Sequence, residues 1–502
     1  SRPRAQVFFT SLIALRACLE MAVGPPSPLG EGSLPSAPTA PEQRVAFFTA
    51  LFQGSKLEAR DCQGKGVGVF ARQAVVEGEV LFGEEPDGAF QWRRAPLACE
   101  HCLRMLGTMD FQMRLLLDAG AKPDDGCGTT GLLPDLQGNE AVLAEAIAGW
   151  SPWSDAAWYC SEACAAEQRQ EFAMLKGQEP HVRAFVHHAV EVGVPFFPIA
   201  LKVLLKGSGL LPSLLQRPYW ECVDLPEENP TAFLEEIKGD LLASWELLQK
   251  LDLPCKPDSL EAYSRLVGSL CLNAVAVKYA HPLIYYIQEV DQGRGGDEAK
   301  NKLRPMLESL RDARLKRASA VRASAGEADS GSGSDGADSD SSDLEDDELH
   351  FSWPGSASSG GGRGRAGRAS RDGRGETFEF SSRLFPPLKG YGLYSRLSAC
   401  NHSCDPSAEV VFAGSAKLLL VARRAMAAGD EVCISYIDHE EADKEERQQG
   451  LNSYGFCCDC CRCQPPPAQK KKKRRKVSAG VAPAEEPPQA RRVKACRGGR
   501  PR

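Results

Sequence analysis

Closely spaced cysteines give this chain its clearest chemical signal. The chain has 502 residues and 19 cysteines, which cluster in close pairs. Two such pairs are Cys99-x-x-Cys102 and Cys160-x-x-x-Cys164. Four thiolates in two chelating pairs can surround one zinc ion tetrahedrally. Because the pairs are so close and the total is odd, we expect zinc in a reducing compartment rather than a disulfide framework, with ordinary buried thiols as the alternative.

A second group of cysteines lies between residues 457 and 463. Three thiolates from one short loop can bind one zinc ion together with a fourth ligand from another part of the chain. The three candidates on the loop are Cys458, Cys460 and Cys463. Cys457 and Cys461 stand beside them, so the cysteines alone leave the ligand register open.

Three short motifs accompany this second group. Asn401-His402-Ser403-Cys404-Asp405-Pro406 is followed by Gly429-Asp430-Glu431 and by Ile434-Ser435-Tyr436. Each motif is common by chance, but their order and spacing resemble the signature of a SET-domain protein-lysine methyltransferase. The resemblance is to the SMYD-type branch, whose SET domain is split by a MYND-type zinc module, and within it to the member that lacks the C-terminal TPR-like domain.

The resemblance implies a binding site for S-adenosylmethionine. By it, Tyr436 is the catalytic tyrosine beside the passing methyl group, and Phe456 lies over the adenine. Each role has a purely structural alternative. Tyr436 could be a half-buried tyrosine at the end of a strand, Gly66–Gly68 a tight turn, and Asn273 a polar residue that satisfies a turn. Any contact at Val67 would use backbone. The implied cofactor residues are Lys65, Gly66, Val67, Gly68, Asn273, Ser398, Asn401, His402, Tyr436 and Phe456.

The resemblance also implies two zinc sites. The family spacing Tyr-x-Phe-x-Cys-x-Cys-x-x-Cys fixes the second set of ligands as Cys404, Cys458, Cys460 and Cys463. A MYND module binds two zinc ions in a cross-braced order, and here the second and fourth ligand pairs are missing. We therefore expect a degenerate module with one zinc on Cys99, Cys102, Cys160 and Cys164.

The implied fold is α+β. It is a SET-domain β-fold with a pseudoknot, split by a MYND-like zinc module and a helical insert and followed by a post-SET zinc loop. The local sequence predicts strands over 56–60, 65–71, 78–82, 409–412 and 417–422, and short helices over 111–119 and 139–147. Apolar residues at helical spacing after Asn229-Pro230 predict an amphipathic helix: Phe233, Ile237, Leu241, Trp245 and Leu248.

Composition, together with what the resemblance implies, divides the chain into eight parts. Residues 327–348 carry ten acidic side chains, residues 360–375 five arginines and residues 470–476 seven consecutive basic residues. Such segments cannot build a core. The expected parts are a disordered N-terminal extension (1–41), the first part of the SET domain (42–98), the MYND-like module (99–165), the helical SET insert (166–318), a disordered acidic and Gly/Arg insertion (319–376), the SET catalytic core (377–441), the post-SET zinc loop (442–464) and a disordered basic tail (465–502).

Charge and hydropathy limit the location of the protein. The net charge is −7, and no run of about 18 apolar residues indicates a transmembrane helix. The run 470–476 resembles a nuclear localisation signal, with a tail in weak contact with nucleic acid as the rival. We expect a nuclear monomer without membrane contact, with the cytoplasm as a further location. For the apolar run 8–18, a signal or transit peptide is the alternative to a disordered extension.

From the resemblance we expect an enzyme, a protein-lysine N-methyltransferase with S-adenosylmethionine and zinc as cofactors. Its partner would be a protein substrate, either a histone tail or a non-histone protein. The enzyme must mainly align a neutral lysine amine with the methyl group, so no dedicated base is required. A catalytically inactive SET/MYND scaffold that recruits nuclear partners is the alternative, and a zinc-dependent nucleic-acid-binding protein is a third hypothesis.

Overall fold

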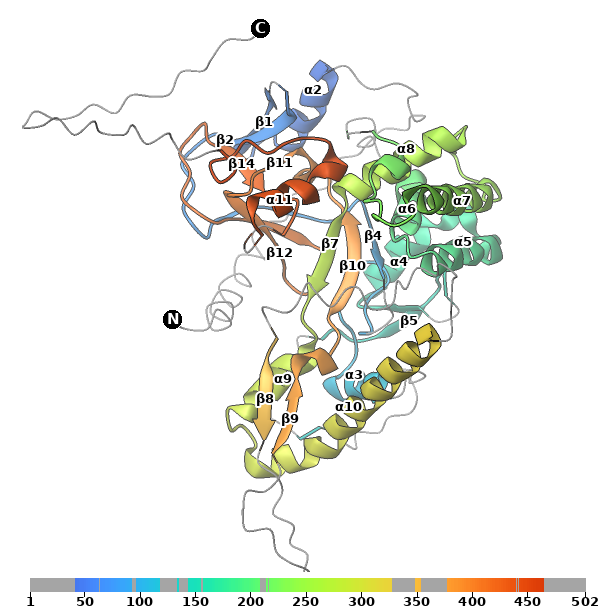
Figure 1. Ribbon diagram of the computed structural model, residues 1–502, viewed down its shortest axis with the longest axis vertical. Coiled ribbons are helices and arrows are strands. Elements are labelled where there is room, and N and C mark those ends of the chain that lie inside the picture. Colours follow the sequence, from blue (N-terminus) through green and yellow to red (C-terminus); the bar gives the residue numbers. More distant parts are fainter. Residues whose placement is uncertain are drawn as a thin grey trace, which may run out of the picture. The chain divides into compact units, whose positions relative to one another are not determined.

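The computed structural model describes residues 41–62, 64–92, 96–117, 133–134, 143–154, 157–207, 214, 216–326, 348–353, 377–438, 440 and 442–464. Within these residues the strands form three small sheets and two two-stranded ribbons. Figure 1 shows the helices between and beside them. Among the described helices, none combines the length and the apolar character needed to cross a membrane.

The sheet that carries the Asn-His motif brings the two ends of the described chain together. Its strand order is β1-β2-β14-β11. The pairing between β11 and β14 is parallel, whereas β2 is antiparallel to both β1 and β14. The bounds are β1 Leu57–Cys62, β2 Gly66–Ala71, β14 Glu431–Ile434 and β11 Asn401–His402.

Two further sheets support this one. The first has the order β4-β10-β7 and the second the order β12-β13-β3, and both are antiparallel. The central strand β13 is buried at every position, which explains its uninterrupted apolar sequence. The bounds are β4 Gly88–Gln91, β10 Leu388–Leu393, β7 Val275–Tyr279, β12 Ala408–Phe412, β13 Leu418–Ala422 and β3 Val80–Glu84.

Helices pack against these sheets and share their hydrophobic core. The amphipathic helix α7 begins after Asn229, with Pro230 in its first turn, and buries Ile237, Leu241 and Leu248 as predicted. Helix α6 contacts β4 and β10 on one side and α5 and α8 on the other. The bounds are α2 Pro41–Leu51, α4 Glu162–Glu171, α5 Glu179–Glu191, α6 Phe196–Lys206, α7 Pro230–Gln249, α8 Leu260–Asn273 and α11 Lys444–Gly450.

A second core lies between three helices and a ribbon. Helix α3 contacts α9 and α10, and the inward side chains of β8 and β9 pack against the same cluster (Figure 1). A small ribbon of β5 and β6 adjoins the first cysteine cluster. The bounds are α3 Met109–Leu117, α9 Pro282–Asp291, α10 Gly296–Gly326, β8 His350–Trp353, β9 Phe378–Ser381, β5 Ile147–Gly149 and β6 Ala157–Tyr159.

The predicted helix over 139–147 is wrong in its described part. Residues 143–147 are not helical: Ala144 bridges to Leu106, and Ile147 begins β5, which pairs with β6. Pairing with a strand that leads into the second cysteine pair overrides the weak helix propensity of this segment. Residues 139–142 lie outside the described residues.

Two predicted boundaries also change. The expected disordered insertion, 319–376, contains the strand β8, in which Phe351 is 5% and Trp353 0% exposed, and α10 extends to residue 326. The expected helical insert, 166–318, contains β7, which pairs along β10. The first 40 residues and the tail 465–502 lie outside the described residues. The pseudoknot that the resemblance implies stays a prediction.

Candidate active site and metal centres

The first predicted cysteine cluster is assembled by a turn and a helix N-terminus. Cys160 and Cys164 flank Ser161, whose hydroxyl caps α4 by accepting a hydrogen bond from the backbone N–H of Cys164 at 3.2 Å. This cap directs both thiols toward the turn that carries Cys99 and Cys102. The four sulfur atoms lie within 4.8 Å of one another.

The sulfur geometry of this cluster fits a metal. The Sγ atom of Cys160 lies 3.5 Å from that of Cys102 and 3.4 Å from that of Cys164. A zinc–sulfur bond of about 2.3 Å separates the corners of a tetrahedron by about 3.8 Å, whereas a disulfide requires about 2.05 Å. The spacing therefore fits four thiolates around one zinc ion and excludes a disulfide.

The second cluster converges in the predicted register. The sulfur atoms of Cys404, Cys458, Cys460 and Cys463 lie within 4.8 Å of one another, and those of Cys404 and Cys463 are 3.5 Å apart. The two other cysteines of the loop, Cys457 and Cys461, are exposed. This arrangement joins the Asn-His-Ser-Cys segment to the C-terminal loop.

Two buried nitrogen donors point at this second cluster. The Nδ1 atom of His402 accepts a hydrogen bond from the backbone N–H of Tyr436 at 3.0 Å, so in the neutral ring Nε2 carries the proton. That Nε2 lies 3.2 Å from the sulfur of Cys404. The guanidinium of Arg447, 5% exposed, donates to the sulfur of Cys463 at 3.8 Å. Donors aimed at sulfur fit thiolates bound to a metal.

The segment Gly66–Gly68 lies in β2 and not in a turn, and it approaches the Asn-His strand very closely. The side-chain amide of Asn401 donates to the Oε1 atom of Glu431 at 2.8 Å. A Cβ atom on Gly68 would lie 2.9 Å from each of these two polar atoms and 2.5 Å from the sulfur of Cys62. A side chain at position 68 would thus displace the Asn401–Glu431 pair, so close approach and not a turn explains the glycine.

Aromatic rings surround the predicted catalytic tyrosine. The ring of Tyr436 lies 4.9 Å from that of Tyr454, 5.4 Å from His402 and 6.4 Å from Phe456. Its hydroxyl donates to the carbonyl of Cys400 at 2.6 Å. Burial raises the pKa of the Tyr436 phenol above its ordinary value, so the group stays protonated at neutral pH. Phe456 remains 39% exposed and offers an open ring face.

The remaining predicted cofactor residues are engaged within the protein. The amide of Asn273 donates to the Ser269 carbonyl of its own helix at 2.7 Å, as the alternative of a polar residue satisfying a turn describes. Val67 is buried and lies opposite Asp61 in the pairing of β1 and β2. Lys65 pairs with Asp459 of the cysteine loop at 3.2 Å. The cofactor roles of these residues stay predictions, as do those of Gly66 and Ser398.

Two carboxyl groups hold the turn that leads to Asn401. Glu84 accepts hydrogen bonds from the backbone N–H groups of Arg396 at 2.7 Å and Leu397 at 3.2 Å. Asp87 accepts one from the hydroxyl of Ser395 at 2.6 Å. Burial raises the pKa of Glu84 to about 8, above its ordinary 4.5. The residue therefore ties the end of β3 to the start of the Asn-His segment.

Sequence reasoning gave no individual role to three residues of this site: Glu84, Glu431 and Tyr454. Glu431 was part of the Gly-Asp-Glu motif and Tyr454 part of the Tyr-x-Phe spacing, so motifs included both. Glu84 stands in an acidic stretch before a proline and resembles an ordinary surface turn. A local pattern could not reveal its partners, because they lie 312 and 313 positions away.

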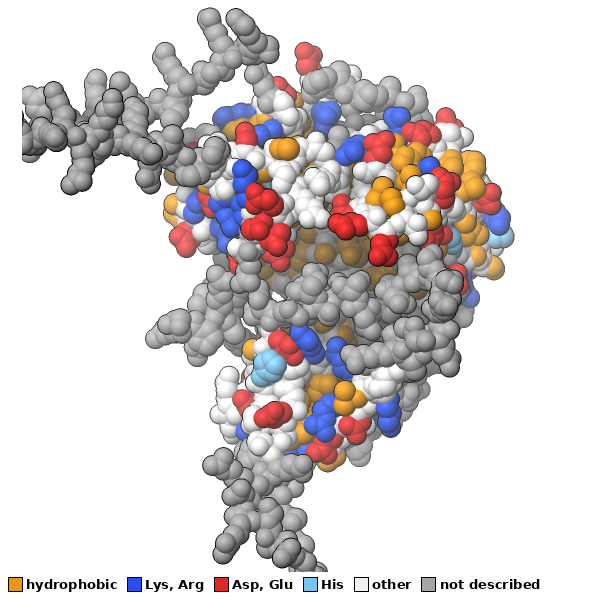
Figure 2. All heavy atoms as spheres, viewed as in Figure 1, with side chains coloured by type: hydrophobic (Ala, Val, Ile, Leu, Met, Phe, Trp, Pro, Cys, Tyr) orange, Lys and Arg blue, Asp and Glu red, His pale blue; other side chains and the backbone are white. Residues whose placement is uncertain are grey.

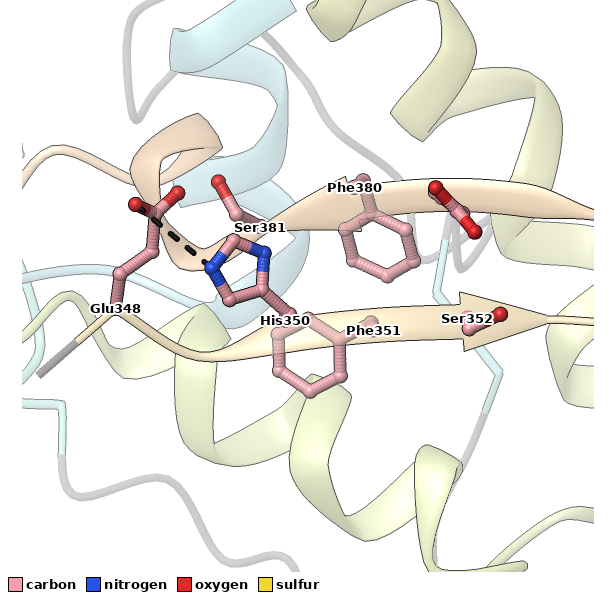
Figure 3. A pocket seen from close by; sticks show the side chains of 7 residues that line it. Glu348, His350, Phe351, Ser352, Phe380 and Ser381 are labelled. Carbon is pink, nitrogen blue, oxygen red and sulfur yellow. Dashed lines mark ion pairs between the residues drawn. The ribbon is translucent and has the colours of Figure 1, made fainter.

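A separate hollow lies on the outer face of β8 and β9 (Figure 3). Its volume is about 440 Å³. The carboxylate of Glu348 at its end pairs with Arg383 at 2.9 Å and lies 3.9 Å from the His350 ring. The hollow contains no predicted site residue; its lining is Glu348, His350, Phe351, Ser352, Glu379, Phe380 and Ser381. We therefore do not assign it to the candidate site.

The surface around α11 carries mixed charge. Figure 2 shows acidic and basic side chains interspersed over this part of the face in view, without one extended basic patch. An extended basic surface is the usual electrostatic footprint of nucleic-acid binding. Any such contact would thus have to come from other surfaces or from the basic segments outside the described residues.

A comparison with protein families identifies residues 262–437 as a SET domain. The matched range begins in α8 and ends just beyond Tyr436. It contains β7 and the Asn401-His402 strand, so the family model places the last part of the predicted helical insert inside the SET domain, in agreement with the pairing of β7 and β10.

Similar proteins share either a short stretch or a weak likeness over most of the chain. The mouse histone-lysine N-methyltransferase SMYD3 is 48% identical over 75 residues, 15% of this chain and 17% of that protein. The chicken protein-lysine N-trimethyltransferase SMYD5 is 42% identical over 89 residues, 17% of this chain and 21% of that protein. The Arabidopsis thaliana histone-lysine N-methyltransferase ATXR2 is 23% identical over 85% of this chain and 94% of its own length. The matches with the first two relatives thus span about a fifth of their length.

Proposed function

Because the chain is a SET-domain protein of the SET/MYND type, we propose that it is an S-adenosylmethionine-dependent protein-lysine N-methyltransferase. The observation that carries the proposal is the convergence of three separate segments around Tyr436. Its hydroxyl, the Asn401 side chain and the open face of Phe456 are brought together by β11, β14 and the second cysteine cluster.

The close approach at Gly68 supports a cofactor beside this sheet. A Cβ at position 68 would displace the Asn401–Glu431 pair, so the glycine preserves the placement of Asn401, which we expect to contact the cofactor. Asn401 is held by Glu431 through its amide nitrogen, which leaves the amide oxygen to accept a hydrogen bond. The exposed ring of Phe456 can stack on a planar base.

S-adenosylmethionine supplies a methyl group on a positively charged sulfur, which leaves with the bonding electron pair. The residues of the site would hold a neutral lysine nitrogen in line with that methyl group, and the methylated nitrogen would release its proton to water. Tyr436 positions this nitrogen. Because its hydroxyl donates to Cys400, its oxygen lone pairs can accept a hydrogen bond from the amine. Its raised pKa keeps it a phenol, so it orients the amine and removes no proton.

Zinc would hold the two halves of this site together. Cys404 lies two residues after the Asn-His strand, whereas Cys458, Cys460 and Cys463 belong to the loop that carries Phe456. A bound ion supplies a tetrahedral crosslink between these segments and adds its binding free energy to folding. The first cluster would hold a second ion in the same manner.

The test is transfer of a labelled methyl group from S-adenosylmethionine to protein. Histone octamers and a protein array should be incubated with the purified chain, and modified lysines should be located by mass spectrometry. Calorimetry with S-adenosylmethionine provides the companion measurement. Cofactor binding without transfer to any substrate would favour a scaffold, and the absence of both would refute the proposal.

The substrate and its location are part of the proposal. The relatives named as histone-lysine and protein-lysine methyltransferases support a lysine of a histone or of another protein as the target. We infer a nuclear site of action from the basic run 470–476. A fluorescent fusion should lose nuclear accumulation when these seven residues are replaced by alanine. Mass measurement in solution tests the expected monomer, and salt-dependent binding to DNA tests the weak nucleic-acid contact.

A further inference from the structure

A line of hydrogen bonds connects the first cysteine cluster with the turn 398–400, which leads to Asn401. The backbone N–H of Ala416 donates to the carbonyl of Cys102 at 2.7 Å. The carbonyl of Ala416 accepts from the hydroxyl of Tyr394 at 2.6 Å. The carbonyl of Tyr394 accepts from both the hydroxyl and the backbone N–H of Ser398, at 2.7 and 3.1 Å. Ser398 lies three residues before Asn401.

Tyr394 occupies the middle of this line and has little freedom to move. Its side chain is 0% exposed. A Cβ atom on Gly392 would lie 2.7 Å from its hydroxyl oxygen and 2.9 Å from two carbons of the ring, so the ring fills the space beside that glycine. Both its hydroxyl and its carbonyl belong to the line. The residue therefore links the Ala416 turn to the Ser398 turn rigidly.

The turn that carries Cys99 and Cys102, at the other end of this line, is also held against the β4-β10-β7 sheet. Leu103 follows Cys102 directly, is 0% exposed and adopts a left-handed backbone conformation with φ 59°. Its carbonyl accepts a hydrogen bond from the hydroxyl of Tyr279 on β7. A Cβ atom on Gly390 of β10 would lie 2.9 Å from its side chain. A metal that fixes this turn therefore fixes atoms that contact two strands of the sheet.

We propose that Tyr394 is a positioning residue, through which the first zinc centre stabilises the turn 398–400 that precedes Asn401. In this arrangement the MYND-like cluster stabilises the segment 398–401 as well as its own module. The coupling acts through packed and hydrogen-bonded groups in direct contact, which gives it a physical carrier. The inference rests on the proposed function only where cofactor affinity is the readout.

The decisive variant is Tyr394→Phe, which removes the hydroxyl and keeps the ring. The matched control is Tyr263→Phe: Tyr263 is also 0% exposed, and its hydroxyl bonds to Ser244 within the helices, away from this line. Both variants lose one buried hydroxyl and should be similarly destabilised. We expect Tyr394→Phe to weaken S-adenosylmethionine binding about three- to tenfold and Tyr263→Phe to leave it unchanged.

Hydrogen exchange supplies a readout that needs no cofactor. The backbone N–H groups of Ser398, Ala399 and Cys400 are bonded within this turn. They should exchange faster in zinc-loaded Tyr394→Phe than in the parent. In Tyr263→Phe their exchange rates should equal those of the parent. Equal exchange of these amides in the two variants would overturn the inference, even if the parent did not bind the cofactor.

A variant of the cluster completes the test. Cys160→Ser removes one ligand of the first cluster. It should accelerate exchange of the amides of 398–400, although Cys160 stands just before α4 and is not itself part of the line of hydrogen bonds. In the Tyr394→Phe background the same substitution should add little, because the line is already interrupted. If the increases in exchange rate caused by the two single substitutions multiplied in the double variant, the two sites would act independently. If Cys160→Ser does not fold, the comparison of the two tyrosine variants still decides.

Discussion

Replacing Gly68 by alanine tests how the candidate cofactor site is built. The added Cβ would lie 2.5 Å from the sulfur of Cys62 and 2.9 Å from the polar atoms of Asn401 and Glu431. All three atoms are tips of side chains, so they can move and the fold should survive. The geometry lost would be the 2.8 Å hydrogen bond from Asn401 to Glu431.

The magnitude follows from that bond. A hydrogen bond to a charged group contributes about 1.5–3 kcal/mol, which corresponds to a loss of roughly 10- to 150-fold in affinity if it orients Asn401 for the cofactor. Calorimetry with S-adenosylmethionine measures this loss, and circular dichroism verifies that the variant is folded. Gly68→Ala combined with Cys62→Ala removes the closest clash and should recover part of the affinity.

Gly239→Ala is the matched control. Gly239 lies exposed in α7, and a Cβ there would meet nothing within 4 Å. Alanine should stabilise the helix by about 1 kcal/mol and leave cofactor binding unchanged. If Gly68→Ala bound the cofactor as tightly as Gly239→Ala, the close approach would have no role in binding and our explanation of this glycine would be wrong.

Three other predictions concern the chemistry, the metal and the pH dependence. Tyr436→Phe should bind S-adenosylmethionine normally but turn over about ten- to a thousandfold more slowly, and equal rates at saturating cofactor would remove the hydroxyl from the mechanism. Metal analysis should find two zinc ions per chain, and Cys460→Ser should lose one of them together with cofactor affinity; a third ion, or retained affinity, would contradict the assignment. The pKa of Glu84 rises from 4.5 to about 8 on folding, so the folded state holds a proton in that interval that the unfolded state has lost, and stability falls as the pH rises through it. Urea unfolding at pH 5.5 and 8 should show a smaller decrease for Glu84→Gln than for the parent, and equal decreases would exclude this carboxyl as the cause.

Metal-binding residues were the most predictable part of the site, because the chemistry requires them in close pairs. Cys458, Cys460 and Cys463 converge with Cys404 in the structure, although that cysteine is separated from them by more than fifty positions. The spacing of a chelating pair is set locally by the chain, and the resemblance supplied the distant fourth ligand. Local geometry together with a motif was therefore sufficient.

Residues whose roles depend on distant partners could not be predicted in this way. Tyr394 and Glu84 act through backbone groups of other segments, which have no sequence signature. The strand β8 was missed for a different reason. Its alternation of buried Phe351 and Trp353 with exposed neighbours covers four residues between two segments of biased composition, so the period-two signal was too short to stand out.

The β1-β2-β14-β11 sheet combines strands that are synthesised at very different times. Cys62 of β1 and Glu431 of β14, whose side chains touch across this sheet, are 369 positions apart. At about 5–20 residues per second, β14 follows β1 and β2 out of the ribosome roughly 20–70 s later. During this time the edge of β2, around Val69 and Phe70, lacks the strand that will cover it. A nascent chain therefore presents an open strand edge, which is the kind of surface that pairs with other chains. Chaperones should be recruited to this N-terminal hairpin during translation.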